Sequence, residues 1–133
     1  MLLTKASEYA LLSLIMISQK NTPQDVDTLS TQLGISKSFL AKILQALAKE
    51  GVLKSFKGAH GGFMLAKDPS EFSIKQIVAC AEKKPTMVLE CTSEHGCCPN
   101  NKAEFCKILP FLNKLQSRID DFLDNMSLKD IIT

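Results

Sequence analysis

The sequence predicts a mostly α-helical fold of the α+β class, with a two-stranded hairpin and a long C-terminal helix. Three observations predict it. Two short amphipathic segments are joined by a tight turn at Gly34, an alternating hairpin follows over residues 52–66, and apolar residues recur at helical spacing from about Leu109. With 133 residues, 45% hydrophobic and 23% charged, the chain has the size and composition of one folded domain.

Three helices are expected before the hairpin. The first covers about residues 4–19, and its apolar middle indicates burial on more than one side. The second begins after Asp25, which can cap it, and ends at Gly34, which can adopt the positive φ of a helix C-cap. The third begins after Ser36 and ends at Gly51.

The third helix separates an apolar stripe from a small, basic and polar outer face. The stripe comprises Phe39, Leu40, Ile43, Leu44 and Leu47. The outer face comprises Lys37, Ser38, Ala41, Lys42, Gln45 and Lys49. A helix that enters the major groove of DNA needs such a face. Any helical hairpin in a bundle can show the same pattern, so the helices alone leave both interpretations open.

The hairpin after the third helix favours the first interpretation. Residues 52–56 alternate like a strand, and residues 63–66 return as a second strand after a glycine-rich loop. A two-stranded wing in this position makes the fold a winged helix-turn-helix. The wing loop offers Lys57, Gly58 and His60, which suit contact with phosphate or with the minor groove. For His60 the alternative is a solvated loop histidine without a role.

We expect two regions that pack as one compact unit. Residues 1–67 form the winged helix-turn-helix region, and residues 68–133 hold a cysteine-bearing loop and the long helix. Ser73 opens a helix on which Cys80 lies among apolar neighbours, so we expect Cys80 to be a buried core thiol. The apolar stripe of the long helix comprises Phe111, Leu112, Leu115, Ile119, Phe122, Leu123 and Met126. This stripe packs either on its own domain or on a second copy, because two-fold dimers match palindromic DNA sites.

Charge and hydropathy indicate the partners and the location. Residues 1–67 hold eight Lys and four acidic residues, whereas residues 68–133 hold seven Lys and one Arg against ten acidic residues. A basic first half favours a polyanion partner, although an ordinary solvated surface has the same balance. No apolar run reaches the roughly 20 residues that span a bilayer. No apolar segment with a cleavage site opens the chain, so we expect a cytoplasmic protein without a membrane partner.

Four of the five cysteines lie within sixteen residues: Cys91, Cys97, Cys98 and Cys106. A reducing cytosol disfavours disulfides, so this clustering indicates metal or redox chemistry. No CxxC pair occurs, and three thiolates on one loop suit an iron–sulfur cluster, either two-iron or four-iron. Cys91 and Cys106 are the outer candidates, and the middle ligand is Cys97 or Cys98. Thiol redox sensing, zinc binding and the absence of chemistry are the alternatives.

No catalytic arrangement accompanies these residues. The sequence shows no Ser/His/Asp set, no paired carboxylate site and no phosphate-binding glycine loop, and both histidines, His60 and His95, lie in expected loops. We therefore predict that the protein is not an enzyme. A small iron–sulfur electron-transfer protein is the alternative of another class.

Taken together, these segments resemble the IscR/NsrR-type (Rrf-two) family of bacterial winged-helix transcription regulators over nearly the whole chain. The matching segments are TKASEYAL at residues 4–11, GIS with FL and IL at residues 34–44, GVLKS and GAHGGFMLA at residues 51–66, the cysteine loop, and SLKDI at residues 127–131. The wing is the most specific of them.

The resemblance implies a homodimeric regulator whose recognition helices enter successive major grooves of double-stranded DNA. We expect it to bind a palindromic operator and to act as a repressor. It implies an iron–sulfur cluster that senses iron–sulfur status, nitric oxide or redox state. In the nitric-oxide-sensing branch the fourth ligand is an acidic residue of the partner's first helix, and Glu8 stands at that position. Cys98 resembles the family's middle cysteine. The implied ligand set is Cys91, Cys98, Cys106 and Glu8.

The same hypothesis assigns the contacts with DNA. The expected phosphate contacts are Lys5, Lys37, Lys42 and Lys57. Ser36 and Ser38 stand where the recognition helix enters the groove, and Gly58 and His60 belong to the wing.

Overall fold

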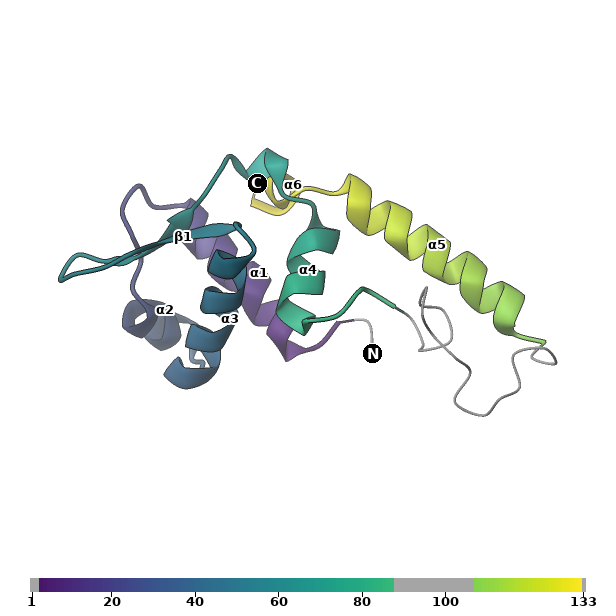
Figure 1. The fold of residues 1–133 in the computed structure, drawn as a ribbon, viewed down its shortest axis with the longest axis horizontal. Coiled ribbons are helices and arrows are strands. Elements are labelled where there is room, and N and C mark those ends of the chain that lie inside the picture. The colour runs from purple at the N-terminus through teal and green to yellow at the C-terminus, as the bar shows by residue number, and fades with distance from the viewer. Residues whose placement is uncertain (1–2, 88–106, 133) are drawn as a thin grey trace.

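The computed structural model describes residues 3–87 and 107–132 of the chain. The elements in order are α1 (Lys5–Ser18), α2 (Val26–Leu33), α3 (Lys37–Lys49), β1 (Leu53–Phe56), β2 (Gly62–Leu65), the short 3₁₀ helix η1 (Pro69–Glu71), α4 (Ile74–Glu82), α5 (Leu109–Asn125) and α6 (Leu128–Ile132). The predicted class, mostly helical with a two-stranded wing, is confirmed (Figure 1).

Local side-chain caps set the ends of the helix-turn-helix as the sequence predicts. The Asp25 carboxylate accepts a hydrogen bond from the backbone N–H of Thr28 at 3.0 Å. The Ser36 hydroxyl accepts one from the backbone N–H of Phe39 at 3.2 Å. Gly34 ends α2 with a φ of 68°, the left-handed conformation that favours glycine. The turn between α2 and α3 is therefore defined by short-range chemistry.

One hydrophobic core joins the first helices to the last. Its fully buried side chains include Leu14 of α1, Leu44 and Leu47 of α3, Ile77 of α4 and Leu128 of α6. Side chains buried in this way contribute roughly 1.5–3 kcal/mol each to folding. Because α6 belongs to this core, the end of the chain is attached to the same body as the helix-turn-helix.

Two backbone hydrogen bonds bring the C-terminal segment back to the start of α4. The N–H of Ile74 donates to the carbonyl of Met126, and the N–H of Leu128 donates to the carbonyl of Phe72, each at 2.8 Å. Between them Ser127 and Ser73 form an isolated antiparallel bridge. α5 is therefore anchored at its C-terminal end.

The wing projects from the body as a thin hairpin, opposite the side on which α5 extends (Figure 1). β1 and β2 pair antiparallel, from Leu53 opposite Leu65 to Phe56 opposite Gly62. Burial along β1 does not alternate as the sequence suggests, since Leu53 is buried and residues 54–56 are exposed. Leu53 at the base and Phe63 of β2 reach the core, whereas residues 54–60 are exposed to solvent.

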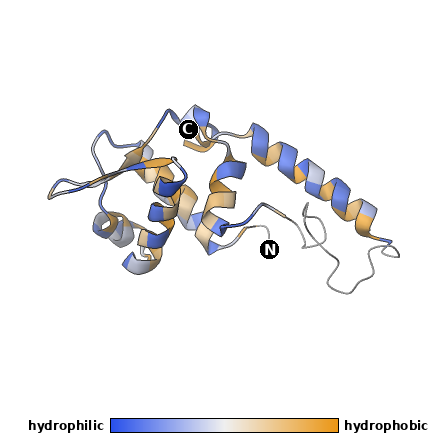
Figure 2. Ribbon diagram, in the orientation of Figure 1, coloured by the Kyte–Doolittle hydropathy of each residue, from blue (hydrophilic) through white to orange (hydrophobic). Residues whose placement is uncertain are grey.

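α5 extends away from the rest of the molecule, and hydrophobic residues recur along it (Figure 2). It packs against α4, and its buried residues are Leu112, Gln116 and Leu123. Phe111 and Phe122 stay 62% and 61% exposed. The predicted apolar stripe thus divides between an internal face and a face that its own chain leaves uncovered. Among the described residues, no helix has both the length and the apolar character needed to span a bilayer.

Candidate nucleic-acid interface

α3 presents the outer face that the sequence predicts. Leu40, Ile43, Leu44 and Leu47 are buried against the body of the molecule. Lys37, Ser38, Lys42, Gln45 and Lys49 are exposed, and Ala41 is partly exposed. The solvent side of α3 therefore carries short polar groups and cations, which can approach base edges and phosphates.

Phe39 is the exception to the predicted stripe of α3. Its side chain is 40% exposed. Its ring meets that of Tyr9 of α1 edge to face, with ring centres 5.8 Å apart and an interplanar angle of 83°. This geometry is favourable for aromatic pairs. The first turn of α3 is therefore held against the first half of α1 by an aromatic contact at the edge of the core.

An ion pair also joins the first turn of α2 to the first turn of α3. Lys37 Nζ of α3 lies 2.8 Å from a carboxylate oxygen of Asp27 of α2, and both side chains are more than half exposed. Ion pairs this exposed contribute little to stability. A DNA phosphate can therefore compete with Asp27 for Lys37 at low energetic cost.

The wing loop is exposed at each predicted position, Lys57, Gly58 and His60. Gly62 at the base of the loop has a φ of 149°, and a Cβ there would lie 2.5 Å from the backbone of Gln24. This close approach allows Phe63 and Gln24 to exchange two backbone hydrogen bonds of 2.9 and 3.0 Å. The wing is therefore fastened to the segment before α2, which fixes its direction relative to the helix-turn-helix.

The first turn of α1 carries Lys5 and Glu8 as an ion pair of 2.8 Å. The side chains are 71% and 50% exposed, so the pair lies in solvent. The hydrogen bond with Glu8 raises the pKa of Lys5 above its usual value. Lys5 Nζ also lies 5.9 Å from the centre of the Tyr9 ring. Both predicted functional residues of α1 therefore share one small exposed cluster.

A carboxylate that the sequence reasoning missed fastens this first turn to the end of α4. Glu82 accepts hydrogen bonds from the backbone N–H and hydroxyl of Thr4 and from the hydroxyl of Ser7. Burial would raise the pKa of Glu82, but the hydrogen bonds from Ser7 and Thr4 outweigh it and hold this pKa below its usual value. No local pattern announces a contact across 78 residues. Glu82 places the N-terminus of α1 beside the segment that leads toward the cysteines.

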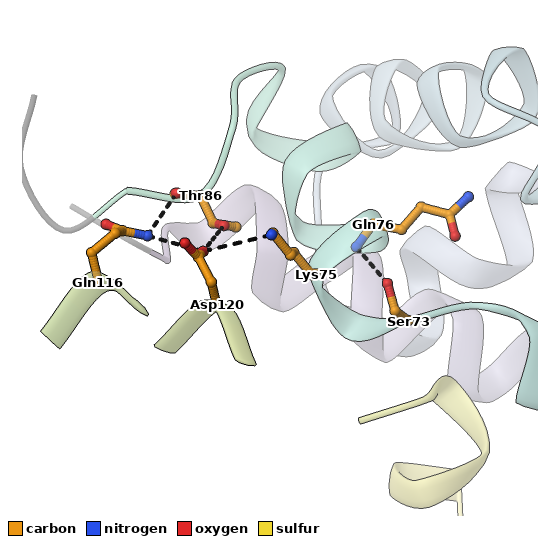
Figure 3. A network of polar contacts seen from close by, with 6 residues as sticks. All are labelled: Ser73, Lys75, Gln76, Thr86, Gln116 and Asp120. Atoms are coloured by element: carbon orange, nitrogen blue, oxygen red, sulfur yellow. Dashed lines mark hydrogen bonds and ion pairs between the residues drawn. The ribbon is translucent and has the colours of Figure 1, made fainter. Parts of the chain in front are cut away.

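A second polar network, also missed from the sequence, fastens α5 to the segment after α4 (Figure 3). Gln116 Nε2 of α5 donates to the carbonyl of Thr86 and to the carboxylate of Asp120, each at 3.0 Å. The Thr86 hydroxyl donates to the same carboxylate at 3.2 Å, and Lys75 Nζ lies 3.8 Å from it. Gln116 and Thr86 are buried, so the bond from Gln116 to the Thr86 carbonyl is protected from water.

Cys80 is only partly buried, whereas the sequence predicts a buried core thiol. Its thiol donates to the carbonyl of Ala46 at 3.3 Å, and burial raises its pKa. It lines an open groove of about 720 Å³ between α3 and α4, together with Lys42, Lys49 and Lys83. The thiol faces the groove because α4 turns its most apolar side toward α1.

Of the predicted metal ligands, the structure describes Glu8 but not the cysteines. Cys91, Cys97, Cys98 and Cys106, with His95, lie outside the described residues. Within residues 3–87 and 107–132, no group of three His, Cys, Asp or Glu side chains is placed to hold a metal ion. Glu8 offers an exposed carboxylate whose ion-pair partner is a solvated lysine. A carboxylate in this setting can serve as one ligand of a centre whose other ligands are thiolates.

Two helices joined at Gly34, a wing and a basic outer face on α3 define the class, a winged-helix DNA-binding transcription regulator. A sequence model of the Rrf2 family, described as an iron-dependent transcriptional regulator, matches residues 3–133. The chain belongs to the Rrf2 family. Since the matched proteins are transcription regulators, the prediction that the chain is not an enzyme is confirmed.

Individual relatives agree with this assignment. The chain is 26% identical to the HTH-type transcriptional regulator IscR of Yersinia pseudotuberculosis (serotype O:1b, strain IP 31758), over 99% of this chain and 79% of that protein. It is 25% identical to IscR of Klebsiella pneumoniae (strain 342), over 99% of this chain and 80% of that protein.

Solved structures share the fold. The T. potens IscR structure has a TM-score of 0.74 at 20% identity, covering 98% of this chain and 85% of that one. CymR of B. subtilis, the global cysteine regulator, has a TM-score of 0.72 at 20% identity, covering 98% and 95%. The oxidized form of Staphylococcus aureus CymR has a TM-score of 0.74 at 21% identity, covering 99% and 96%.

Proposed function

We propose that this regulator binds a palindromic operator as a homodimer, that it acts as a repressor, and that an iron–sulfur cluster controls its affinity for DNA. The observation that carries the proposal is the exposed basic face of α3 beside a wing of fixed direction, in a chain of a family described as iron-dependent. The ligands in this proposal are Cys91, Cys98, Cys106 and Glu8, with Cys97 as the alternative middle ligand.

The proposed contacts with DNA follow the exposed polar groups. Ser36, Ser38 and Lys42 lie on the outer side or at the start of α3, where side chains reach base edges and phosphates. Lys37 and Lys5 reach phosphates once they leave their exposed ion pairs. Lys57, Gly58 and His60 make the wing contact. Each phosphate neutralised adds roughly 0.9 to the salt dependence of binding on a log–log scale.

The uncovered face of α5 supports the homodimer. Ile108, Phe111 and Phe122 are 58%, 62% and 61% exposed, which is unusual for large apolar side chains on one amphipathic helix. A second α5 that packs against this face removes all three from water. A two-fold arrangement also presents two α3 helices to successive major grooves.

Glu8 supports the link between the ligand set and DNA reading. It lies next to Tyr9, whose ring touches Phe39 in the first turn of α3. An iron–sulfur cluster supplies a centre that reacts with oxidants and nitric oxide. In this proposal Glu8 is a ligand of the cluster. The contact between the Tyr9 and Phe39 rings connects the helix that carries this carboxylate to the first turn of α3.

The first test is a spectrum together with analysis of iron and sulfide, on protein purified without oxygen. We expect visible absorption bands and about equal iron and sulfide. The same sample, loaded and after removal of iron, is then titrated with an operator selected from random DNA. A colourless, iron-free protein that still binds the operator contradicts the cluster and leaves the DNA-binding proposal standing.

The second test asks which chain supplies Glu8. One chain carries Glu8→Gln, and its partner carries Ser in place of Cys91, Cys98 and Cys106. If Glu8 serves the cluster of the partner chain, the mixed dimer has one complete ligand set and retains iron. If Glu8 serves its own chain, the mixed dimer has none and loses iron like either parent.

A second candidate function keeps DNA binding and replaces the cluster by oxidation of cysteine thiols, or by zinc. The likeness to a structure named as the oxidized form of CymR favours thiol oxidation over zinc. A protein without iron whose operator affinity changes reversibly with peroxide and dithiothreitol supports this candidate. Retention of zinc without iron and sulfide supports the zinc variant.

A further inference from the structure

The ion pair in the first turn of α1 joins two residues with different proposed roles. Lys5 is a proposed phosphate contact, and Glu8 is a proposed ligand of the metal centre. Their charged atoms lie 2.8 Å apart at i and i+3 on one helix face. The positive charge that Lys5 offers to DNA is therefore neutralised by its own chain.

Aromatic contacts place this pair beside the start of the recognition helix. Lys5 Nζ lies 5.9 Å from the centre of the Tyr9 ring, and that centre lies 5.8 Å from the centre of the Phe39 ring. Phe39 follows Lys37 and Ser38 in the first turn of α3. The Tyr9 ring therefore links Lys5 to the first turn of α3, which is a DNA contact in the proposed function.

We propose that Glu8 is an internal counter-ion that withholds Lys5 from DNA, and that an iron centre that took the Glu8 carboxylate as a ligand would end its ion pair with Lys5 and leave that lysine to bind a phosphate. This inference rests on the proposed function for the position of the DNA and for the ligand role of Glu8. It adds a switch within one turn of α1, because the Glu8 carboxylate either pairs with Lys5 or binds the iron centre.

The size of the effect follows from exposure. A solvated ion pair is weak, so removal of Glu8 changes DNA affinity modestly, by about two- to fivefold at low salt. The clearer sign is the salt dependence, because one additional cation at the DNA steepens its slope by roughly 0.9.

The experiment uses the full chain without iron, so that no loaded centre contributes. Wild type, Glu8→Gln, Lys5→Ala and the double variant are titrated with the selected operator and with a random duplex of equal length, at several salt concentrations. Glu71→Gln is the matched control, because it removes one exposed negative charge on η1, away from Lys5, Tyr9 and Phe39. Thermal melting of each variant confirms that it is folded.

We expect Glu8→Gln to bind both duplexes two- to fivefold more tightly with the steeper slope, and Glu71→Gln to match wild type. In the Lys5→Ala background, Glu8→Gln should give no gain, because the double-mutant cycle isolates the pair. An equal gain in that background shows that Glu8 repels DNA directly and overturns the proposal, as does an unchanged slope in Glu8→Gln.

Failure of this inference differs from failure of the proposed function. If Lys42→Ala lowers affinity while Glu8→Gln has no effect, DNA binding stands and the switch is wrong. If wild type binds neither duplex, both without iron and after reconstitution with iron and sulfide, both proposals are wrong. If Glu8→Gln behaves as expected, wild type is next reconstituted with iron and sulfide. Its log–log salt slope of DNA binding should then equal that of the iron-free Glu8→Gln protein. A slope that stays at the value of iron-free wild type contradicts the release of Lys5.

Discussion

At the scale of the residue, two short polar side chains hold the helix-turn-helix in shape. Asp25 caps α2 and Ser36 caps α3, each by accepting a backbone N–H of the first turn. Such caps satisfy donors that the helix itself leaves unpaired. Ser36 therefore has a structural role at the start of α3 in addition to its proposed contact with DNA.

We expect Asp25→Ala to lower the free energy of unfolding by about 1 kcal/mol and Asp25→Asn to lower it much less, because Asn keeps the acceptor. Hydrogen bonds from Thr28 hold the pKa of Asp25 below its usual value. The stabilisation is therefore complete above the unfolded pKa, about 3.9, and is lost as the pH falls through the lower folded pKa. Urea unfolding at pH 7 and near pH 2.5 measures this. An equal effect of Asp25→Ala at both pH values contradicts it.

Lys42 is the sharpest test of the recognition face. We expect Lys42→Ala to flatten the log–log salt slope of operator binding by roughly 0.9, since one phosphate contact is lost. Lys129→Ala, an exposed lysine of α6, is the control and should leave the slope unchanged. An unchanged slope in Lys42→Ala removes this residue from the DNA contacts.

At the scale of the element, α5 is built for two kinds of contact. One side buries Leu112, Gln116 and Leu123 within the chain, and the other leaves Phe111 and Phe122 in solvent. Aromatic side chains dominate the energy of protein interfaces when they are buried. In the proposed homodimer the exposed side of α5 forms the interface, whereas the buried side attaches the helix to its own chain.

We expect Phe122→Ser to weaken the dimer by about 2 kcal/mol, and Phe111→Ser combined with it to give a monomer at micromolar concentration. Analytical ultracentrifugation measures the change. Phe56→Ser is the matched control, since this ring is also exposed but lies in the wing. A dimer that survives the double substitution places the interface elsewhere.

What the sequence predicts well is local. The caps at Asp25 and Ser36 and the left-handed turn at Gly34 depend on a few neighbouring residues, and the structure has each of them. The exposed ring of Phe39 and the partly exposed thiol of Cys80 depend on how α1, α3 and α4 pack, which helical spacing does not encode. The contacts of Glu82 with Thr4 and of Gln116 with Thr86 join distant segments, so no pattern within one element announces them.

At the scale of the whole molecule, the first turn of α1 and the exposed face of α3 belong to one folded unit in the described part of the chain. The α1 turn with Glu8 is fastened to the end of α4 by Glu82, and Tyr9 connects α1 with α3. α6 returns the end of α5 to the common core through Leu128. A change at Glu8, the proposed ligand, can therefore reach α3 through packed elements that have defined contacts.

We expect a variant with Ser in place of Cys91, Cys98 and Cys106 to bind the operator with an affinity that does not respond to iron supply, oxygen or nitric oxide. Wild type should respond to at least one of them, by tenfold or more if the coupling energy reaches about 1.4 kcal/mol. Cys80→Ser is the matched control, because this cysteine lies on α4, outside the cluster of four. Loss of the response in Cys80→Ser would place the sensor in the α3–α4 groove.

The hydrogen bond between Gln116 and Thr86 spans 30 positions of the chain and encloses the whole cysteine segment between its two ends. Bringing the two ends of a segment of this length together costs conformational entropy. That cost is part of folding and is not added when a metal binds. Binding of the proposed metal centre by a segment whose two ends are already held together is therefore less unfavourable than binding by a segment whose ends are held less firmly. We therefore expect a chelator to remove iron from the Gln116→Ala variant at a higher rate than from wild type, although the substitution changes no proposed ligand.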